Sequence, residues 1–144
     1  MKLRVYCDMD DVLCDFMGAH HAARKKNPAQ MYPQAEMDFF RKLKPLDNAI
    51  HAMSELSDNY DVWILTRPSV HNPLCYTEKR LWVQDHLGIE FCHKLIICPD
   101  KSLLKGDILI DDQKWEDFEG EQLLFGSSEF PDWYTVLNYL QINY

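Results

Sequence analysis

The sequence lacks the features that mark several classes of protein. It has no run of eighteen consecutive apolar residues, which argues against a transmembrane helix. It shows no internal repeat, no low-complexity segment and, from Met1 to Leu3, no apolar signal region. Its five cysteines are odd in number and include no Cys-x-x-Cys pair. We therefore expect a soluble, cytoplasmic protein with reduced and mostly buried thiols, of which Cys75 is the one expected to be exposed.

Basic residues are also scarce. The chain has 15 lysines and arginines against 23 aspartates and glutamates, a net charge of −8. The longest basic run, Arg24-Lys25-Lys26, ends an expected helix. This balance disfavours binding along a nucleic-acid backbone, and nothing indicates a membrane. With 144 residues, the chain is expected to form one domain, spanning 1–144.

Three carboxylates follow the first expected strand. The stretch from Leu3 to Cys7 reads as a buried β-strand, and Asp8, Asp10 and Asp11 come directly after it. Like charges this close repel one another, so a fold that keeps them usually uses them for a cation or a reaction. The alternative is an ordinary solvated acidic turn.

The rest of the chain alternates between expected helices and strands. Such alternation predicts an α/β fold with a parallel sheet of about five strands, whose carboxyl ends share one edge. The helix after the acidic motif is expected to direct its first backbone N–H groups toward an anion. The expected strands are 61–65, 94–98, 106–112 and 122–125, and the expected helices are 12–26, 34–42, 49–56, 77–86 and one opened by Pro131.

Polar residues end four of the expected strands: Asp8 with Asp10, Thr66, Lys101, and Asp111 with Asp112. An oxygen-rich set of ligands without imidazole favours Mg²⁺ over Zn²⁺, and Mg²⁺ readily accepts phosphate oxygens. His20 and His21 are adjacent, face different directions and are expected in a surface or core role.

A phosphate ester at this edge could be attacked by a carboxylate. Asp8 is the best-placed nucleophile, and Asp10 could protonate the leaving alkoxide and then deprotonate the attacking water. Thr66, Arg67 and Lys101 are the candidates to hold the phosphate oxygens.

The four motifs resemble those of the haloacid dehalogenase-like (HAD) phosphohydrolases. They read Asp8-Met-Asp10-Asp-Val12, Leu65-Thr66, Lys101 and Ile110-Asp111-Asp112. The resemblance implies a Rossmann-like HAD fold and an aspartyl-phosphate on Asp8. It also implies a Mg²⁺ ion held by Asp8, Asp10 and Asp112, with Asp111 orienting the site from behind. Receiver domains use similar residues, but their lysine comes last, whereas Lys101 precedes Asp111 by ten positions (111 − 101 = 10).

Longer stretches resemble the 5'(3')-deoxyribonucleotidases, which remove phosphate from deoxynucleoside monophosphates. These stretches are 8–16, 39–46, 78–83, 100–112 and the Pro131-Asp-Trp133 step. The resemblance implies that Phe16 packs on the nucleobase, although Phe16 could equally be a core aromatic residue. It also implies a small helical cap, roughly 17–46.

The chain departs from that family at four places. Asp11 stands where the family usually has Gly, Arg67 where it commonly has Ser, and Pro99 where it has an Arg. The cap is short, and the family's base-stacking Phe-Trp pair has no counterpart, so Tyr32, Met37 and Phe40 are the candidates to replace it.

We therefore expect a Mg²⁺-dependent phosphomonoester hydrolase acting on nucleoside monophosphates, with a homodimer as an open possibility. One alternative keeps this chemistry for another small phosphate ester or a nucleic-acid end. The other is a non-catalytic nucleotide-binding protein in which Asp11 and Arg67 have spoiled the site.

Overall fold

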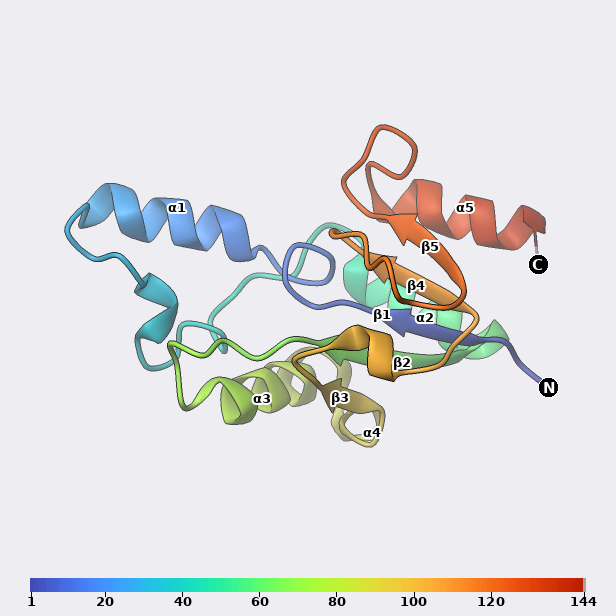
Figure 1. Cartoon of the computed structure of the whole chain (residues 1–144), viewed down its shortest axis with the longest axis horizontal. Coiled ribbons are helices and arrows are strands. Elements are labelled where there is room, and N and C mark those ends of the chain that lie inside the picture. The colour runs from blue at the N-terminus through green and yellow to red at the C-terminus, as the bar shows by residue number, and fades with distance from the viewer. Residues whose placement is uncertain (144) are drawn as a thin grey trace.

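A five-stranded parallel sheet forms the centre of the protein (Figure 1). The structure is a computed structural model and describes residues 1–143. The strand order is β3-β2-β1-β4-β5, so β1, which carries the acidic motif, is central. This confirms the predicted α/β fold. The strands are β1 (Arg4–Cys7), β2 (Asp61–Thr66), β3 (Leu95–Ile97), β4 (Ile108–Asp111) and β5 (Glu121–Leu124). The helices are α1 (Phe16–Lys26), α2 (Ala49–Asn59), α3 (Cys75–Leu87), α4 (Ile89–Cys92) and α5 (Trp133–Asn143), with short 3₁₀ turns η1 (Pro33–Ala35) and η2 (Lys101–Leu103).

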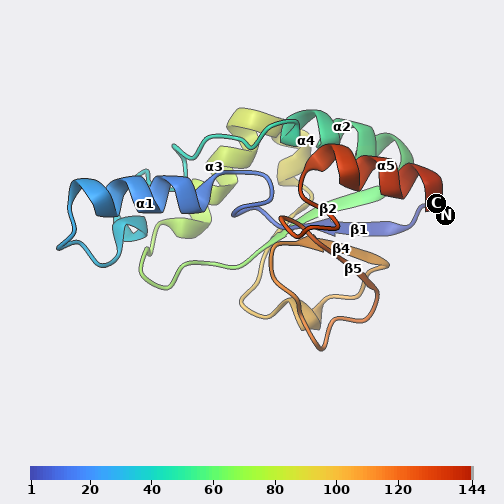
Figure 2. The same ribbon diagram turned by 90° about the horizontal axis from the view of Figure 1, so that it is seen from above.

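The two faces of the sheet are covered differently. Figure 2 shows α2, α3, α4 and α5 on one face, while the loops that flank β4 cover the other. The larger core lies under the helices and includes Trp82 and Trp133, which are fully buried. A smaller cluster around Tyr6 and Phe118 lies beneath the loops. Apolar side chains project from both faces of β1 and β4 and are covered on each side, so these strands are buried over most of their length.

The cap projects from the body of the protein. Helix α1 extends away from the carboxyl edge of the sheet, and none of its residues is fully buried (Figures 1 and 2). The chain returns through η1 and a series of turns to α2, and Phe40 and Leu43 anchor this return segment in the core. The start of β1 and the end of α5 lie at the opposite side of the molecule (Figure 1).

Three expectations about local structure were wrong. The first helix begins at Phe16 and not at Val12, because residues 12–14 form buried turns in which the N–H groups of Leu13 and Cys14 both donate to Met9 O. The predicted helix 34–42 is a 3₁₀ turn followed by further turns. Cys75 is fully buried, and its Sγ accepts a hydrogen bond from Ser69 N.

The five cysteines are all free thiols. Burial raises the pKa of the Cys7 and Cys14 thiols well above their usual range, so they remain protonated packing groups. Across residues 1–143, no helix has the length and apolar character needed to cross a membrane.

Candidate active site

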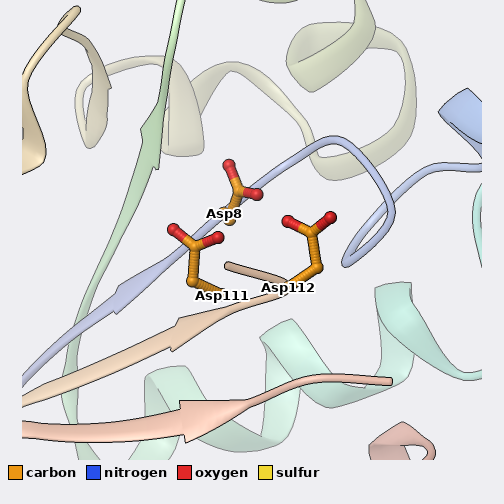
Figure 3. A group of neighbouring side chains, drawn as sticks. All are labelled: Asp8, Asp111 and Asp112. Atoms are coloured by element: carbon orange, nitrogen blue, oxygen red, sulfur yellow. The ribbon is translucent and has the colours of Figure 1, made fainter. Parts of the chain in front are cut away.

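Three carboxylates meet at the carboxyl ends of β1 and β4. Asp8 follows Cys7, which is paired with Ile110, and Asp8 N donates a hydrogen bond to Ile110 O at 2.9 Å. This register places Asp8 beside Asp111 and Asp112. Carboxylate oxygens of the three residues all lie within 4.8 Å of one another, and Figure 3 shows the carboxylates directed into one shared space.

Lys101 is the cation of this cluster. Its Nζ donates to Asp8 Oδ1 at 2.7 Å and to Asp111 Oδ2 at 2.6 Å, and its side chain is 1% exposed. Burial opposes the charge on Lys101, but the attraction of Asp8 and Asp111 outweighs it and raises the lysine pKa. The 3₁₀ turn η2 therefore places a charged lysine side chain next to the predicted nucleophile, Asp8.

One ammonium does not balance three carboxylates. Burial, and then the hydrogen bond and charge of Asp8, raise the pKa of Asp112 from 3.8 to about 8. Burial and the charge of Asp8 also raise the pKa of Asp111. The cluster supplies only oxygen ligands, which is the donor set that hard divalent cations prefer. Within residues 1–143, this is the one group of three or more acidic, His or Cys side chains close enough to share a metal ion.

Asp10 lies apart from these three carboxylates. Its Oδ2 accepts from Lys79 Nζ at 3.2 Å, and this ammonium also donates to Thr66 Oγ1 at 2.6 Å and to Arg67 O at 2.5 Å. Lys79 is 1% exposed and comes from α3. It thus joins the predicted acid/base to the predicted phosphate-binding threonine. Lys79 lies in the family-like stretch 78–83, but a lysine inside an expected helix does not by itself indicate a role in the site.

A pocket of about 290 Å³ opens over the carboxylates. Phe16 and Phe40 form part of its wall, and their rings stack with centroids 6.0 Å apart. The predicted cap residues Tyr32 and Met37 are not among the described residues that line it. Instead, Tyr32 stacks on His71 with centroids 3.9 Å apart, and Met37 is exposed.

Arg67 lies at the rim of the same pocket. Its guanidinium carbon is 5.4 Å from the ring centroid of Trp115, and its side chain is exposed. The structure therefore brings Arg67 to the pocket with Thr66 and Lys101. Gln34, in the 3₁₀ turn η1, and Trp115, in the loop after Asp112, also line the pocket. Both were missed because neither belongs to one of the four motifs.

Asp11 lines the pocket but is not one of the three clustered carboxylates. Its backbone has a φ of 63°, a left-handed conformation that favours Gly, and its Oδ1 accepts a hydrogen bond from Met17 N at 2.9 Å. Asp15 similarly accepts from Gly18 N at 2.9 Å. The expected anion site at the start of the first helix is therefore wrong, because the protein's own carboxylates occupy these N–H groups.

Similarity to known proteins covers most of the chain. The sequence model of the family described as "5' nucleotidase, deoxy (Pyrimidine), cytosolic type C protein" matches residues 25–132, or 108 of 144 residues. A Vibrio phage KVP40 protein, provisionally named a 5'(3')-deoxyribonucleotidase, is 37% identical over 94% of this chain and 83% of its own length. The human cytosolic 5'(3')-deoxyribonucleotidase is 30% identical over 94% of this chain and 79% of the human protein.

A solved structure shows the same fold. A hydrolase of the haloacid dehalogenase-like family from Streptococcus pneumoniae superposes with a TM-score of 0.61, covering 96% of this chain and 90% of that one at 15% identity. The resemblance seen in the sequence motifs is thereby confirmed at the level of family and fold. The chain belongs to the 5'(3')-deoxyribonucleotidase family, whose members are phosphomonoester hydrolases, and it has the HAD-like fold.

Proposed function

We propose that the protein is a Mg²⁺-dependent 5'(3')-deoxyribonucleotidase that acts through an aspartyl-phosphate on Asp8. The observation that carries this proposal is the convergence of Asp8, Asp111 and Asp112 with Lys101 at one sheet edge, in a chain of this family. Residues 1–144 would form one HAD-like domain, with the cap at roughly 17–46. The cytosolic human relative supports a cytoplasmic location.

The carboxylates suit a Mg²⁺ ion in number and chemistry. Asp8 and Asp112 would hold it, together with Asp10 as the third ligand that the family resemblance implies. The bound ion would draw charge from the phosphate oxygens and so favour attack on phosphorus. Asp111, held by Lys101 at 2.6 Å and by Gln113 N at 3.0 Å, would orient the cluster.

Asp8 would attack the phosphorus atom. A new bond forms between the Asp8 carboxylate and phosphorus, and the bond from phosphorus to the ester oxygen breaks. Asp10 gives a proton to the departing alkoxide. In the second step, Asp10 takes a proton from water, whose oxygen attacks the phosphorus and releases inorganic phosphate from Asp8.

Lys101 would assist the attack by Asp8. It lies 2.7 Å from Asp8, so its charge would lower the repulsion between the carboxylate and the incoming phosphate. Thr66 and Arg67, which line the same pocket, would hold the remaining phosphate oxygens.

The pocket volume fits a small ester and not a long polymer. Phe16 is half-buried in its wall, where its ring stacks on Phe40 and on His20, and its remaining exposed surface would contact a nucleobase. The test is phosphate release from a panel of deoxy- and ribonucleoside 5'- and 3'-monophosphates together with sugar phosphates. Release that favours deoxynucleotides supports the proposal, and release from sugar phosphates alone would replace the nucleotide with another ester.

A further inference from the structure

Trp115 is a pocket residue whose backbone is fixed from β5. It lies in the loop between β4 and β5, four residues after Asp111. Trp115 N donates to Gln122 Oε1 at 2.8 Å, and Gln122 Nε2 donates to Trp115 O at 2.6 Å. Two hydrogen bonds from one side chain hold both backbone groups of Trp115, so the loop presents its indole in a defined position.

The face of this indole lies beneath two cations. The guanidinium carbon of Arg67 is 5.4 Å from the ring centroid, and Lys101 Nζ is 5.9 Å from it. Both distances are within the range of a cation–π attraction. Lys101 is also fixed by two carboxylates, whereas Arg67 is an exposed side chain at the pocket rim. The ring is therefore a substantial restraint on where the guanidinium lies.

The edge of the indole has a different contact. Trp115 Nε1 donates to Asp111 Oδ2 at 3.2 Å, and this oxygen also accepts from Lys101 at 2.6 Å. The other oxygen, Asp111 Oδ1, accepts from Gln113 N at 3.0 Å. The indole N–H is thus one of three donors that fix the rotation of the Asp111 carboxylate.

We propose that Trp115 is a positioning residue with two separable roles, one exerted through its ring face and one through its N–H. The face holds the guanidinium of Arg67 toward the substrate phosphate, and the N–H holds Asp111 in the orientation that metal binding requires. This inference rests on the proposed function, in which Arg67 binds phosphate and the carboxylates bind a divalent cation.

Substitutions can separate the two roles. Trp115→Phe keeps an aromatic face but removes the N–H, whereas Trp115→Leu removes both. Trp63 supplies a matched control, because it lies beneath Arg4 and Lys94 at 5.8 and 5.5 Å but is not among the residues that line the pocket. Calorimetry gives the dissociation constants for Mg²⁺ and for inorganic phosphate in the presence of Mg²⁺, and thermal unfolding verifies that each variant is folded.

Each variant has its own expected pattern. Trp115→Phe weakens Mg²⁺ binding by about tenfold, because Asp111, which would orient the metal-binding cluster, loses one of its three donors. Its phosphate affinity at saturating Mg²⁺ stays within about twofold of wild type, because a ring still supports Arg67. Trp115→Leu weakens Mg²⁺ binding similarly and also weakens phosphate binding by about two- to fivefold. Trp63→Leu changes neither constant.

A double variant tests whether the ring acts through Arg67. In the Arg67→Ala background, Trp115→Leu is expected to cause no further loss of phosphate affinity. If the double variant instead loses phosphate affinity by the product of the two single losses, the role of the ring face is overturned. Unchanged Mg²⁺ affinity in Trp115→Phe would overturn the role of the N–H. If wild type binds Mg²⁺ but neither binds phosphate nor releases it from any ester, the proposed function fails. The proposal for the ring face fails with it. The role of the N–H is then decided by the Mg²⁺ dissociation constants of wild type and Trp115→Phe.

Discussion

The ammonium of Lys79 lies 3.2 Å from Asp10 Oδ2, and the lysine side chain is almost completely buried. The same ammonium donates to Thr66 Oγ1 at 2.6 Å. One residue of α3 therefore fixes the proposed acid/base and a proposed phosphate ligand relative to each other. Loss of this group would release both from their positions, since no other side chain joins them among the described residues' hydrogen bonds.

Replacing Lys79 with Met is expected to lower kcat by at least about tenfold. Misplaced acid/base groups commonly cost catalysis this much or more. The matched control is Arg80→Met, which changes the next residue of α3 at an exposed position. Steady-state kinetics with thermal unfolding measure the effect, and a folded Lys79→Met protein with the kcat of wild type would contradict this role.

Mg²⁺ is expected to change how stability depends on pH. With chelator present, the folded protein keeps a proton on Asp112, whose pKa is raised to about 8, while the unfolded chain releases it near 3.8. Folding therefore binds a proton between these values, and stability contributed by this group falls as the pH rises. Mg²⁺ replaces the proton, so the melting temperature should rise most at high pH. A melting temperature that Mg²⁺ leaves unchanged from about pH 5 to pH 8 would contradict this prediction.

Asp11 is expected to stabilise the fold without taking part in hydrolysis. Asp11→Ala should lower the free energy of unfolding by about 1–3 kcal/mol, because it loses the hydrogen bond to Met17 N and leaves a β-carbon at a left-handed φ. Asp11→Gly loses the hydrogen bond but relaxes the backbone, so it should be the more stable variant. Denaturant unfolding compares the two, and phosphatase assays on Asp11→Gly should show that turnover is retained. Equal stabilities would contradict the assigned strain.

Phe16 is expected to affect nucleotides selectively. Phe16→Leu should raise the KM for deoxynucleoside monophosphates by about tenfold, since a base loses its stacking partner. The KM for a small ester without an aromatic base, such as glycerol phosphate, should change little. Parallel steady-state assays of the two substrates provide the comparison. An equal change for both would mean that Phe16 is a core residue of the cap rather than a base contact.

The convergence of polar side chains at the carboxyl edge of the sheet could be predicted because these residues lie at the ends of strands in the sequence. In a parallel sheet, Asp8, Thr66 and Asp111 must end on the same side, and the register of β1 with β2 and β4 brings them together. Lys101 was identifiable for the same reason, because it follows β3 closely. The motifs alone therefore sufficed to predict which groups converge, and the positions of the helices were not needed.

Side-chain partners were not predictable in this way. Asp8 and Asp10 are two residues apart, but their spacing did not indicate that Asp10 Oδ2 accepts a hydrogen bond from Lys79, sixty-nine positions away. Trp115 Nε1 donates to Asp111 from a loop whose backbone is held by Gln122 of the next strand. The structure of the cap was also difficult to predict. No residue of α1 is buried, and a helix that buries so little leaves only a weak apolar pattern in the sequence. Contacts of this kind depend on tertiary structure and leave no local periodicity.

The most direct measurement is phosphate release from deoxynucleoside monophosphates by wild type and Asp8→Asn, each with Mg²⁺ and with chelator. Asn keeps the size of Asp8 but removes the nucleophilic oxygen, so the fold should persist while turnover is lost. The expected result is release by wild type with Mg²⁺ alone, and none above background from Asp8→Asn. Full turnover by a folded Asp8→Asn variant would contradict an aspartyl-phosphate mechanism, and no release by wild type would indicate a nucleotide-binding protein without catalysis.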